Sequence, residues 1–250
     1  MAVIWQSAAE THRGNRRRAN EDAVLDRPES RLWAVADGLG GHFGGRIASR
    51  AVVRALRFAR LPEALADRVD AIDDLLQAMN ARLRRRALVT GRDGIMGTTV
   101  TVLTVQGATA VVLWAGDTRL YRLRAGELEL VTRDHSPLQD RLDGAEAPED
   151  ADDSHVVTRA VGCHSALHLD LAVLDVRPDD TFLLCSDGLY RELARDELAA
   201  ALPAAQVECA ATALLDRCLA GPARDNVSLV VVRARTPAAV TGQAGGQRAQ

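Results

Sequence analysis

The chain contains no lysine, and it has very few aromatic residues. All 31 basic side chains among its 250 residues are arginine. This absence excludes a Schiff-base lysine, a P-loop lysine on a nucleotide phosphate, and a kinase lysine paired with a glutamate. Any side-chain cation that binds a phosphate group here must therefore be an arginine. Aromatic residues make up only 3% of the chain, so stacking on nucleic-acid bases has little support.

Cysteine pairs and long apolar runs are also missing. The four cysteines, Cys163, Cys185, Cys209 and Cys218, form no CxxC pair, and the apolar run at the N-terminus is too short for a signal segment. No stretch approaches 18 uncharged apolar residues, so we expect no membrane span. These absences predict a reduced, cytoplasmic protein that does not associate with a membrane.

The residues that are present predict a globular protein with balanced charge. The 31 arginines face 34 acids, for a net charge of −3, which gives no general attraction to nucleic acid. At 47% hydrophobic residues the chain is able to bury a sizeable core. We expect one folded domain over residues 1–235. Residues 236–250, which show no periodicity, are expected to form a disordered tail.

Short β-branched runs and helical spacing alternate along the chain. Strands are predicted at Leu32–Ala36, Thr98–Val105, Ala110–Ala115, Thr181–Ser186 and Val227–Val232. Helices are predicted at Gly45–Arg60, Arg68–Leu88 and Arg195–Cys218, the last broken near Pro203. Hairpin turns are expected at residues 116–118 and 125–127, and a mobile acidic loop at Asp143–His155. This order predicts an α+β fold in which helices cover antiparallel sheets.

Aspartates stand at the ends of several apolar runs. Asp37, Asp117 and Asp187 each finish a strand-like run, whereas Asp22 and Asp225 each precede one. Because the end of one antiparallel strand lies beside the start of its neighbour, these side chains can gather at one edge. Gathered carboxylates repel each other unless a cation lies among them, and oxygen ligands favour Mg²⁺ or Mn²⁺ over Zn²⁺. A single Asp-Gly pair, by contrast, is equally typical of an ordinary turn.

Eight short motifs follow one another between about Ser7 and Arg233. They are Arg17-x-x-Asn20-Glu21-Asp22, Ala34–His42 (AVADGLGGH), Gly97-Thr98-Thr99, Ala115–Leu123 (AGDTRLYRL), Thr132–Ser136 (TRDHS), Thr158–Gly162 (TRAVG), Leu183–Leu189 (LLCSDGL) and Asp225-Asn226-Val227. In this order they resemble the metal-dependent protein phosphatases (the PPM family, type 2C) in their small bacterial form. The resemblance implies an αββα sandwich, two packed antiparallel β-sheets flanked by helices, with a metal centre at one end.

The resemblance also implies a set of metal ligands. These are Glu21, Asp22, Asp37, Gly38, Asp117, Asp187 and Asp225. In the family pattern Asp37 bridges two Mn²⁺ or Mg²⁺ ions and the carbonyl of Gly38 binds one of them. Asp117 matches the ligand of a third, weaker ion.

The implied activity is hydrolysis of phosphoserine and phosphothreonine in proteins, in opposition to a bacterial Ser/Thr kinase. The two ions lower the pKa of a bridging water, which attacks phosphorus in line, while Arg17 binds the substrate phosphate. Leu39 stands where eukaryotic relatives carry a histidine, so His42 is a candidate general acid, although such a histidine is more often a packing residue. Arg46 is a second departure, because bacterial relatives commonly carry an acid there. We expect the protein to be a monomer. It resembles the small phosphatases that accompany type VI secretion.

Two other functions fit parts of the sequence. Cys185-Ser-Asp-Gly188-Leu-Tyr-Arg191 matches the CxxGxxR pattern of cysteine-dependent phosphatases, although Leu184 replaces their usual histidine and FLLCS is typical of a buried strand. A pseudophosphatase that binds phosphoproteins without hydrolysis is the other alternative. The arginine clusters at 13–18 and 82–86 are interpreted as an active-site rim and a solvated helix end rather than a nucleic-acid site.

Overall fold

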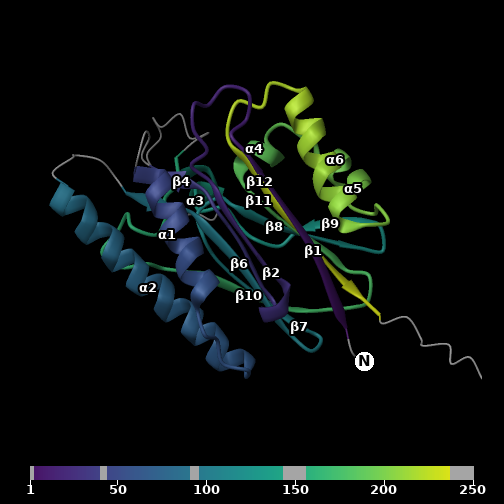
Figure 1. The fold of residues 1–250 in the computed structure, drawn as a ribbon, viewed down its shortest axis with the longest axis horizontal. Coiled ribbons are helices and arrows are strands. Elements are labelled where there is room, and N and C mark those ends of the chain that lie inside the picture. Colours follow the sequence, from purple (N-terminus) through teal and green to yellow (C-terminus); the bar gives the residue numbers. More distant parts are fainter. Residues whose placement is uncertain (1–2, 40–43, 91–95, 143–155, 237–250) are drawn as a thin grey trace, which may run out of the picture.

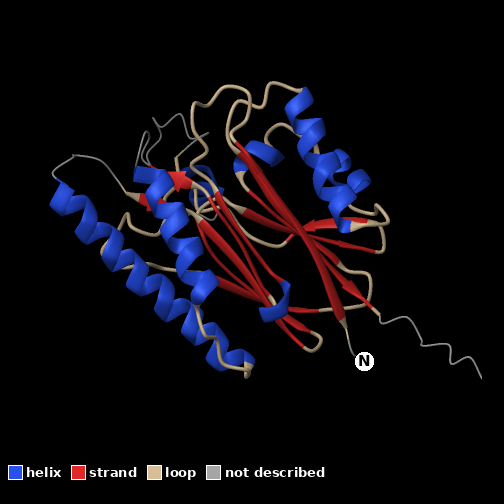
Figure 2. Ribbon diagram, in the orientation of Figure 1, coloured by secondary structure: helices blue, strands red, loops and turns tan. Residues whose placement is uncertain are grey.

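Two antiparallel sheets stack face to face, and helices cover both outer faces (Figures 1 and 2). A computed structural model describes residues 3–39, 44–90, 96–142 and 156–236 of the chain. The strand order is β1-β12-β11-β8-β9 in the first sheet and β10-β7-β6-β3-β2 in the second, with a two-stranded ribbon β4-β5. The α+β sandwich predicted from the sequence is confirmed.

The elements have the following bounds. The first sheet contains β1 (Ile4–His12), β12 (Val227–Arg235), β11 (Thr181–Cys185), β8 (Arg119–Arg124) and β9 (Glu127–Leu130), and the second contains β10 (Asp170–Asp175), β7 (Thr109–Ala115), β6 (Val100–Gln106), β3 (Leu32–Ala36) and β2 (Ala23–Arg27). The ribbon pairs β4 (Gly38–Leu39) with β5 (Gly97–Thr98). The helices are η1 (Pro28–Ser30), α1 (Gly44–Phe58), α2 (Leu65–Thr90), α3 (Pro137–Leu142), α4 (Asp187–Tyr190), α5 (Arg195–Ala201) and α6 (Val207–Ala220).

Three apolar layers hold the sandwich together. Trp33, Phe182 and Val230 belong to the layer between the two sheets. The alternate side chains of β3, such as Leu32, pack with α1 and α2 on one outer face, and α5 and α6 cover the other. Burying one large apolar side chain stabilises a fold by about 1.5–3 kcal/mol, so Trp33 and Phe182, both with no exposed surface, contribute strongly.

Two predicted hairpins have different outcomes. The turn at residues 125–126 joins β8 and β9, whose Arg124 and Glu127 pair, so the hairpin at 125–127 is confirmed. The hairpin predicted at 116–118 is wrong, because β7 lies in one sheet and β8 in the other. That turn instead crosses between the sheets, and Asp117 lies within the crossing.

Further differences concern elements with mixed polarity. The strands β1 and β10 were not predicted, since polar and apolar residues are mixed in IWQSAAETH and half of DLAVLD is exposed. The predicted helix Arg195–Cys218 is two helices, α5 and α6, separated around Pro203 as expected.

The segment Asp143–His155 and residues 237–250 lie outside the described residues. In the part of the chain that the structure describes, no helix has the length and apolar character needed to cross a membrane.

Candidate metal centre

Strand ends bring the predicted acids together at one end of the sandwich. The first residue of β2 pairs with the last residue of β3, so Asp22, just before β2, lies beside Asp37, just after β3. In the other sheet Asp187 follows β11 and Asp225 precedes β12, and these two strands also run antiparallel. Figure 1 shows β4, which follows Asp37, and α4, which begins with Asp187, at the same end of the sheets.

A cavity of about 550 Å³ lies among these strand ends. Its acidic lining is Glu21, Asp37, Asp117, Asp187 and Asp225, its basic lining is Arg16, Arg17 and Arg18, and Ala19, Gly38, Leu39, Val157 and Asn226 complete it. A volume of this size is typical of sites for small ligands. The structure therefore brings five of the six predicted acids to one cavity, with Asp22 buried close to Asp37.

The backbone of Asp37 is fixed by two threonines. Thr98 Oγ1 and the amide of Thr99 both donate to the carbonyl of Asp37, each at 2.8 Å. The amide of Asp37 donates in turn to Thr99 Oγ1 at 3.1 Å. These bonds explain the Gly97-Thr98-Thr99 motif, which holds the turn that places Asp37 at the cavity.

Gly38 and Gly45 lie backbone against backbone. A Cβ atom at Gly38 would lie 2.4 Å from the carbonyl of Gly45, and a Cβ atom at Gly45 would lie 2.5 Å from the carbonyl of Gly38. Only a pair of glycines allows this approach. The contact sets the N-terminal turn of α1 against the turn that carries Asp37.

Replacing Gly45 by Ala is expected to lower the phosphate-ester hydrolysis that the family resemblance implies about tenfold or more, and to destabilise the protein by about 1–3 kcal/mol. The new methyl group must displace Gly38 and hence the neighbouring Asp37. Steady-state kinetics and urea unfolding measure the two effects. Gly221→Ala, whose Cβ would come only within 3.3 Å of its nearest neighbour, is the control. Unchanged kinetics in the Gly45 variant would show that this contact does not position Asp37.

Asp22 is a buried carboxylate with an unsatisfied oxygen. Its residue is 4% exposed, and Ser186 Oγ donates to Oδ2 at 2.8 Å. The other oxygen, Oδ1, has no hydrogen-bond partner among the described residues. Burial raises the pKa of Asp22 to about 7, and the charge of Asp187 adds to this rise. A buried acceptor without a donor, surrounded by like charges, is suited to a nearby cation.

Asp117 and Asp187 share one arginine. Arg191 lies 3.5 Å from Asp117 Oδ2 and 3.2 Å from Asp187 Oδ2. Burial raises the pKa of Asp117 to about 7, with the charge of Asp187 next in importance, and Arg191 opposes this rise. The arginine thus compensates part of the repulsion between the two acids.

The turn that carries Asp117 is held by residues to which sequence reasoning gave no role. His135 Nδ1 accepts a bond from the amide of Gly116 at 3.0 Å, and the amide of His135 donates to the carbonyl of Gly116 at 3.0 Å. Tyr190 Oη donates to the carbonyl of Asp117 at 3.1 Å. Gly116 has a φ of +113°, and a Cβ there would meet Thr99 at 2.5 Å. The motif TRDHS contained the signal for His135, but no spacing rule links it to Gly116.

Arg17 and Asp225 form an ion pair at the wall of the cavity. Arg17 Nη2 donates to Asp225 Oδ2 at 2.6 Å, and this bond raises the pKa of Arg17 against the opposing effect of burial. The next residue, Asn226, accepts a bond from the amide of Glu21 at 2.8 Å. The Asp225-Asn226 pair therefore connects β12 to the segment that contains both Arg17 and Glu21.

The acids as a group fit a hard divalent cation in chemistry and in charge. Burial raises the pKa of Asp37 well above its ordinary value, and the charges of Asp22 and Asp187 raise it further. Carboxylate and carbonyl oxygens are the donors that Mg²⁺ and Mn²⁺ prefer. Within residues 3–39, 44–90, 96–142 and 156–236, no three or more His, Cys, Asp or Glu side chains are arranged so that they could hold an ion. Arg17 pairs with Asp225, and Arg191 pairs with Asp117 and Asp187, so metal binding would require these three acids to exchange arginine for the ion.

Three other residues that the sequence analysis singled out are His42, Arg46 and Cys185, and two of them, Arg46 and Cys185, do not line the acid-lined cavity. His42 falls in residues 40–43, which lie outside the described residues. Arg46 is exposed in the first turn of α1. Cys185, the last residue of β11, has no exposed surface, and burial raises the pKa of its thiol far above the ordinary value.

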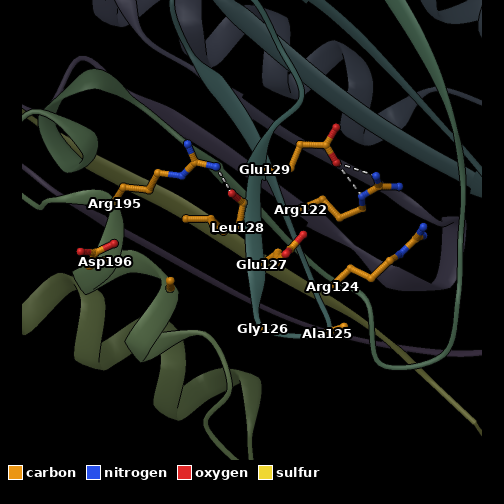
Figure 3. A pocket seen from close by; sticks show the side chains of 10 residues that line it. Arg122, Arg124, Ala125, Gly126, Glu127, Leu128, Glu129, Arg195 and Asp196 are labelled. Atoms are coloured by element: carbon orange, nitrogen blue, oxygen red, sulfur yellow. Dashed lines mark hydrogen bonds and ion pairs between the residues drawn. The ribbon is translucent and has the colours of Figure 1, made fainter.

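Another pocket, of about 640 Å³, lies between β9 and α5 (Figure 3). Arg122 donates to Glu129, Arg124 pairs with Asp180 at 2.6 Å, and Arg195 donates to the carbonyl of Leu128. Each guanidinium in this pocket has an oxygen partner, and none of the predicted ligand acids lines it. The acid-lined cavity remains the candidate functional site.

Comparisons with known proteins agree with this site. Residues 11–220 match the family described as protein phosphatase 2C. The serine/threonine protein phosphatase PstP of Mycobacterium tuberculosis is 34% identical over 236 residues, which are 92% of this chain and 45% of the relative. The chain therefore spans about half the length of the first curated relatives that it matches.

Two solved structures have the same fold. One, described as PppA, a key regulatory component of T6SS in Pseudomonas aeruginosa, is 42% identical with a TM-score of 0.87, over 92% of this chain and 98% of the other. The other is the catalytic domain of PstP in complex with two manganese ions. It is 32% identical with a TM-score of 0.78, over 94% of this chain and 100% of the other.

Proposed function

This chain belongs to the protein phosphatase 2C family, and from that membership we propose that it is a metal-dependent phosphatase of phosphoserine and phosphothreonine in proteins. One observation carries the proposal. Five acids and Arg17 line a single cavity at the end of the sandwich, and the pKa values of Asp37 and Asp117 are raised there. Raised carboxylate pKa values in a cavity are typical of functional sites.

Each predicted ligand has a place in this proposal. Asp37, Asp187 and Asp225 would bind two core ions together with the carbonyl of Gly38, and Asp117 would bind a third. Glu21 and Asp22 would act on these ions through water. When bound, divalent ions lower the pKa of coordinated water and neutralise charge on phosphoryl oxygens. We propose Mn²⁺ or Mg²⁺, with support from the PstP catalytic domain that contains two manganese ions.

Arg17 is proposed to bind the substrate phosphate. Its guanidinium lies at the cavity wall, 2.6 Å from Asp225. Once Asp225 turns to a metal ion, the planar guanidinium can bind two phosphoryl oxygens at the same time. His42 is proposed as the general acid that protonates the leaving serine or threonine oxygen.

We also propose the domain extent, the oligomeric state, the location and the biological role of the protein. Residues 1–235 would form the catalytic domain, acting as a monomer in the cytoplasm. The 42% identity to the P. aeruginosa T6SS component supports a role in type VI secretion control. In that role the enzyme would remove phosphate that a Ser/Thr kinase adds.

Cys185→Ala is expected to hydrolyse a phosphothreonine peptide within about twofold of the unsubstituted protein. The thiol is fully buried with a raised pKa, and Arg191 is bound to Asp187 and Asp117, so a cysteine-dependent mechanism lacks its thiolate. The small cavity left behind costs roughly 1 kcal/mol of stability. Release of inorganic phosphate from phosphothreonine and phosphotyrosine peptides with Mn²⁺ measures both rate and substrate class.

The same assay separates the three functions. Phosphate release from the phosphothreonine peptide by both proteins supports the proposal. Loss of activity only in the Cys185 variant would support the cysteine-dependent alternative. No phosphate release by either protein, together with peptide binding measured by fluorescence polarisation, would identify a pseudophosphatase.

A further inference from the structure

The loop between β1 and β2 carries four arginines with different environments. Arg13 Nη1 donates to the carbonyl of Arg17 at 3.0 Å, and Arg17 pairs with Asp225. Arg16 and Arg18 also line the acid-lined cavity, and both are exposed. Neither side chain makes a hydrogen bond or ion pair within the described part of the chain. Two guanidiniums that have no partner among the described residues therefore flank the proposed phosphate-binding arginine.

Hydrogen bonds from two asparagine side chains hold the backbone of this loop. Asn15 Nδ2 donates to the carbonyls of Leu219 and Gly221 at 2.9 and 3.1 Å. Asn226 Nδ2 donates to the carbonyls of Arg13 and Ala19 at 3.0 and 2.9 Å. The loop is thus anchored on both sides of residues 16–18. Such anchoring reduces the backbone entropy lost when a ligand binds.

From this arrangement we propose that Arg16 and Arg18 form a subsite for acidic side chains next to the phosphorylated residue of the substrate. The proposal rests on the proposed function, and it names the substrate class as phosphopeptides with Asp or Glu beside the phosphoserine or phosphothreonine. Arginine binds carboxylates through a planar pair of N–H donors. The Cα atoms of residues 16 and 18 lie roughly 7 Å apart at most, a spacing that reaches side chains on both sides of one phosphorylated residue.

The size of the cavity agrees with this subsite. Its volume of about 550 Å³ exceeds what one phosphoryl group needs, so flanking side chains of a peptide can enter. Of the acids that line the cavity, Glu21 belongs to the same β1–β2 loop as Arg16 and Arg18, whereas Asp37, Asp117, Asp187 and Asp225 come from other segments. A substrate carboxylate that met Arg16 or Arg18 would form an ion pair, while a substrate lysine would meet like charge.

The test compares two phosphothreonine peptides that differ only in their flanking residues, Asp and Glu in one and Asn and Gln in the other. We expect the acidic peptide to bind about tenfold more tightly in low salt, by fluorescence polarisation, and to show a similarly higher kcat/KM. The difference should shrink at higher salt, since exposed charges are screened. In the double variant Arg16→Gln/Arg18→Gln the acidic-to-neutral ratio should fall to about one.

A control variant removes one exposed arginine charge away from the cavity. Arg57 is exposed in the last turn of α1, roughly 18 Å along the helix from Gly45, and Arg57→Gln should keep the tenfold ratio. A ratio near one for the unsubstituted protein, or a ratio that the double variant preserves, overturns the subsite. Because binding is measured apart from turnover, a protein that binds the acidic peptide selectively but releases no phosphate supports the subsite and contradicts the proposed function.

Discussion

Asp37→Asn is expected to reduce phosphothreonine hydrolysis by roughly 10³-fold or more while it raises the thermal stability of the metal-free protein. Asparagine keeps the shape of the side chain but removes the charge that would hold two metal ions. Burial and the charges of Asp22 and Asp187 raise the pKa of Asp37 well above its ordinary value, so the ionised carboxylate is less favourable in the folded state than in the unfolded chain. Asparagine has no carboxylate that must either stay ionised in this environment or take up a proton on folding, so the melting temperature in EDTA should increase.

Phosphate release and differential scanning fluorimetry measure the two effects on the same sample. Asp196→Asn makes the same chemical change in the exposed first turn of α5, outside the acid-lined cavity. It should alter neither phosphate release nor the melting temperature. Activity lost together with stability would show that Asp37 has a structural role. Near-normal turnover in the Asp37 variant would contradict its assignment as a bridging ligand.

The metal-free protein is expected to lose stability as the pH rises from about 4 to about 7, and excess Mn²⁺ at pH 8 should restore it. The pKa values of Asp22 and Asp117 are raised to about 7 in the folded state, mainly by burial. A group with a raised folded pKa contributes stability that is present below its unfolded pKa and is lost as the pH passes its folded pKa. A rise of about three units corresponds to roughly 4 kcal/mol at most for each group.

Urea unfolding at pH 5, 7 and 8, in EDTA and in MnCl₂, checks this expectation. Asp117→Asn isolates one of the two groups, so the loss of stability between pH 5 and pH 8 should be smaller in that variant. Stability in EDTA that stays level or increases over this range would contradict the raised pKa values. Protection by Mn²⁺ should also weaken below pH 7, where protons compete with the metal for the same oxygens.

The positions of the acids could be predicted from the sequence because strand ends are local features. The run before Asp37 is apolar throughout, and the structure gives β3 the same bounds, Leu32–Ala36, that the pattern indicates. The antiparallel pairing of β2 with β3 then follows from general sheet geometry. The fold class and the location of the site at one end of the sheets could therefore be predicted from the sequence.

The contacts that hold the acids in place could not be predicted from the sequence. Glycine and aspartate at residues 116–117 are typical both of a hairpin and of a crossing between sheets, and only tertiary packing decides between the two. Asn226 contacts Glu21 across a large sequence separation, and no periodicity indicates such a pair. Arg191 was predicted only as part of a cysteine motif, whereas the structure places it on Asp117 and Asp187.

The most direct test of the metal-dependent account is phosphate release from one phosphothreonine peptide while Mn²⁺ is titrated into EDTA-treated protein. We expect no release in EDTA, saturable recovery with Mn²⁺, and no effect of a thiol alkylator at any metal concentration. Release that persists in EDTA and disappears on alkylation would contradict it.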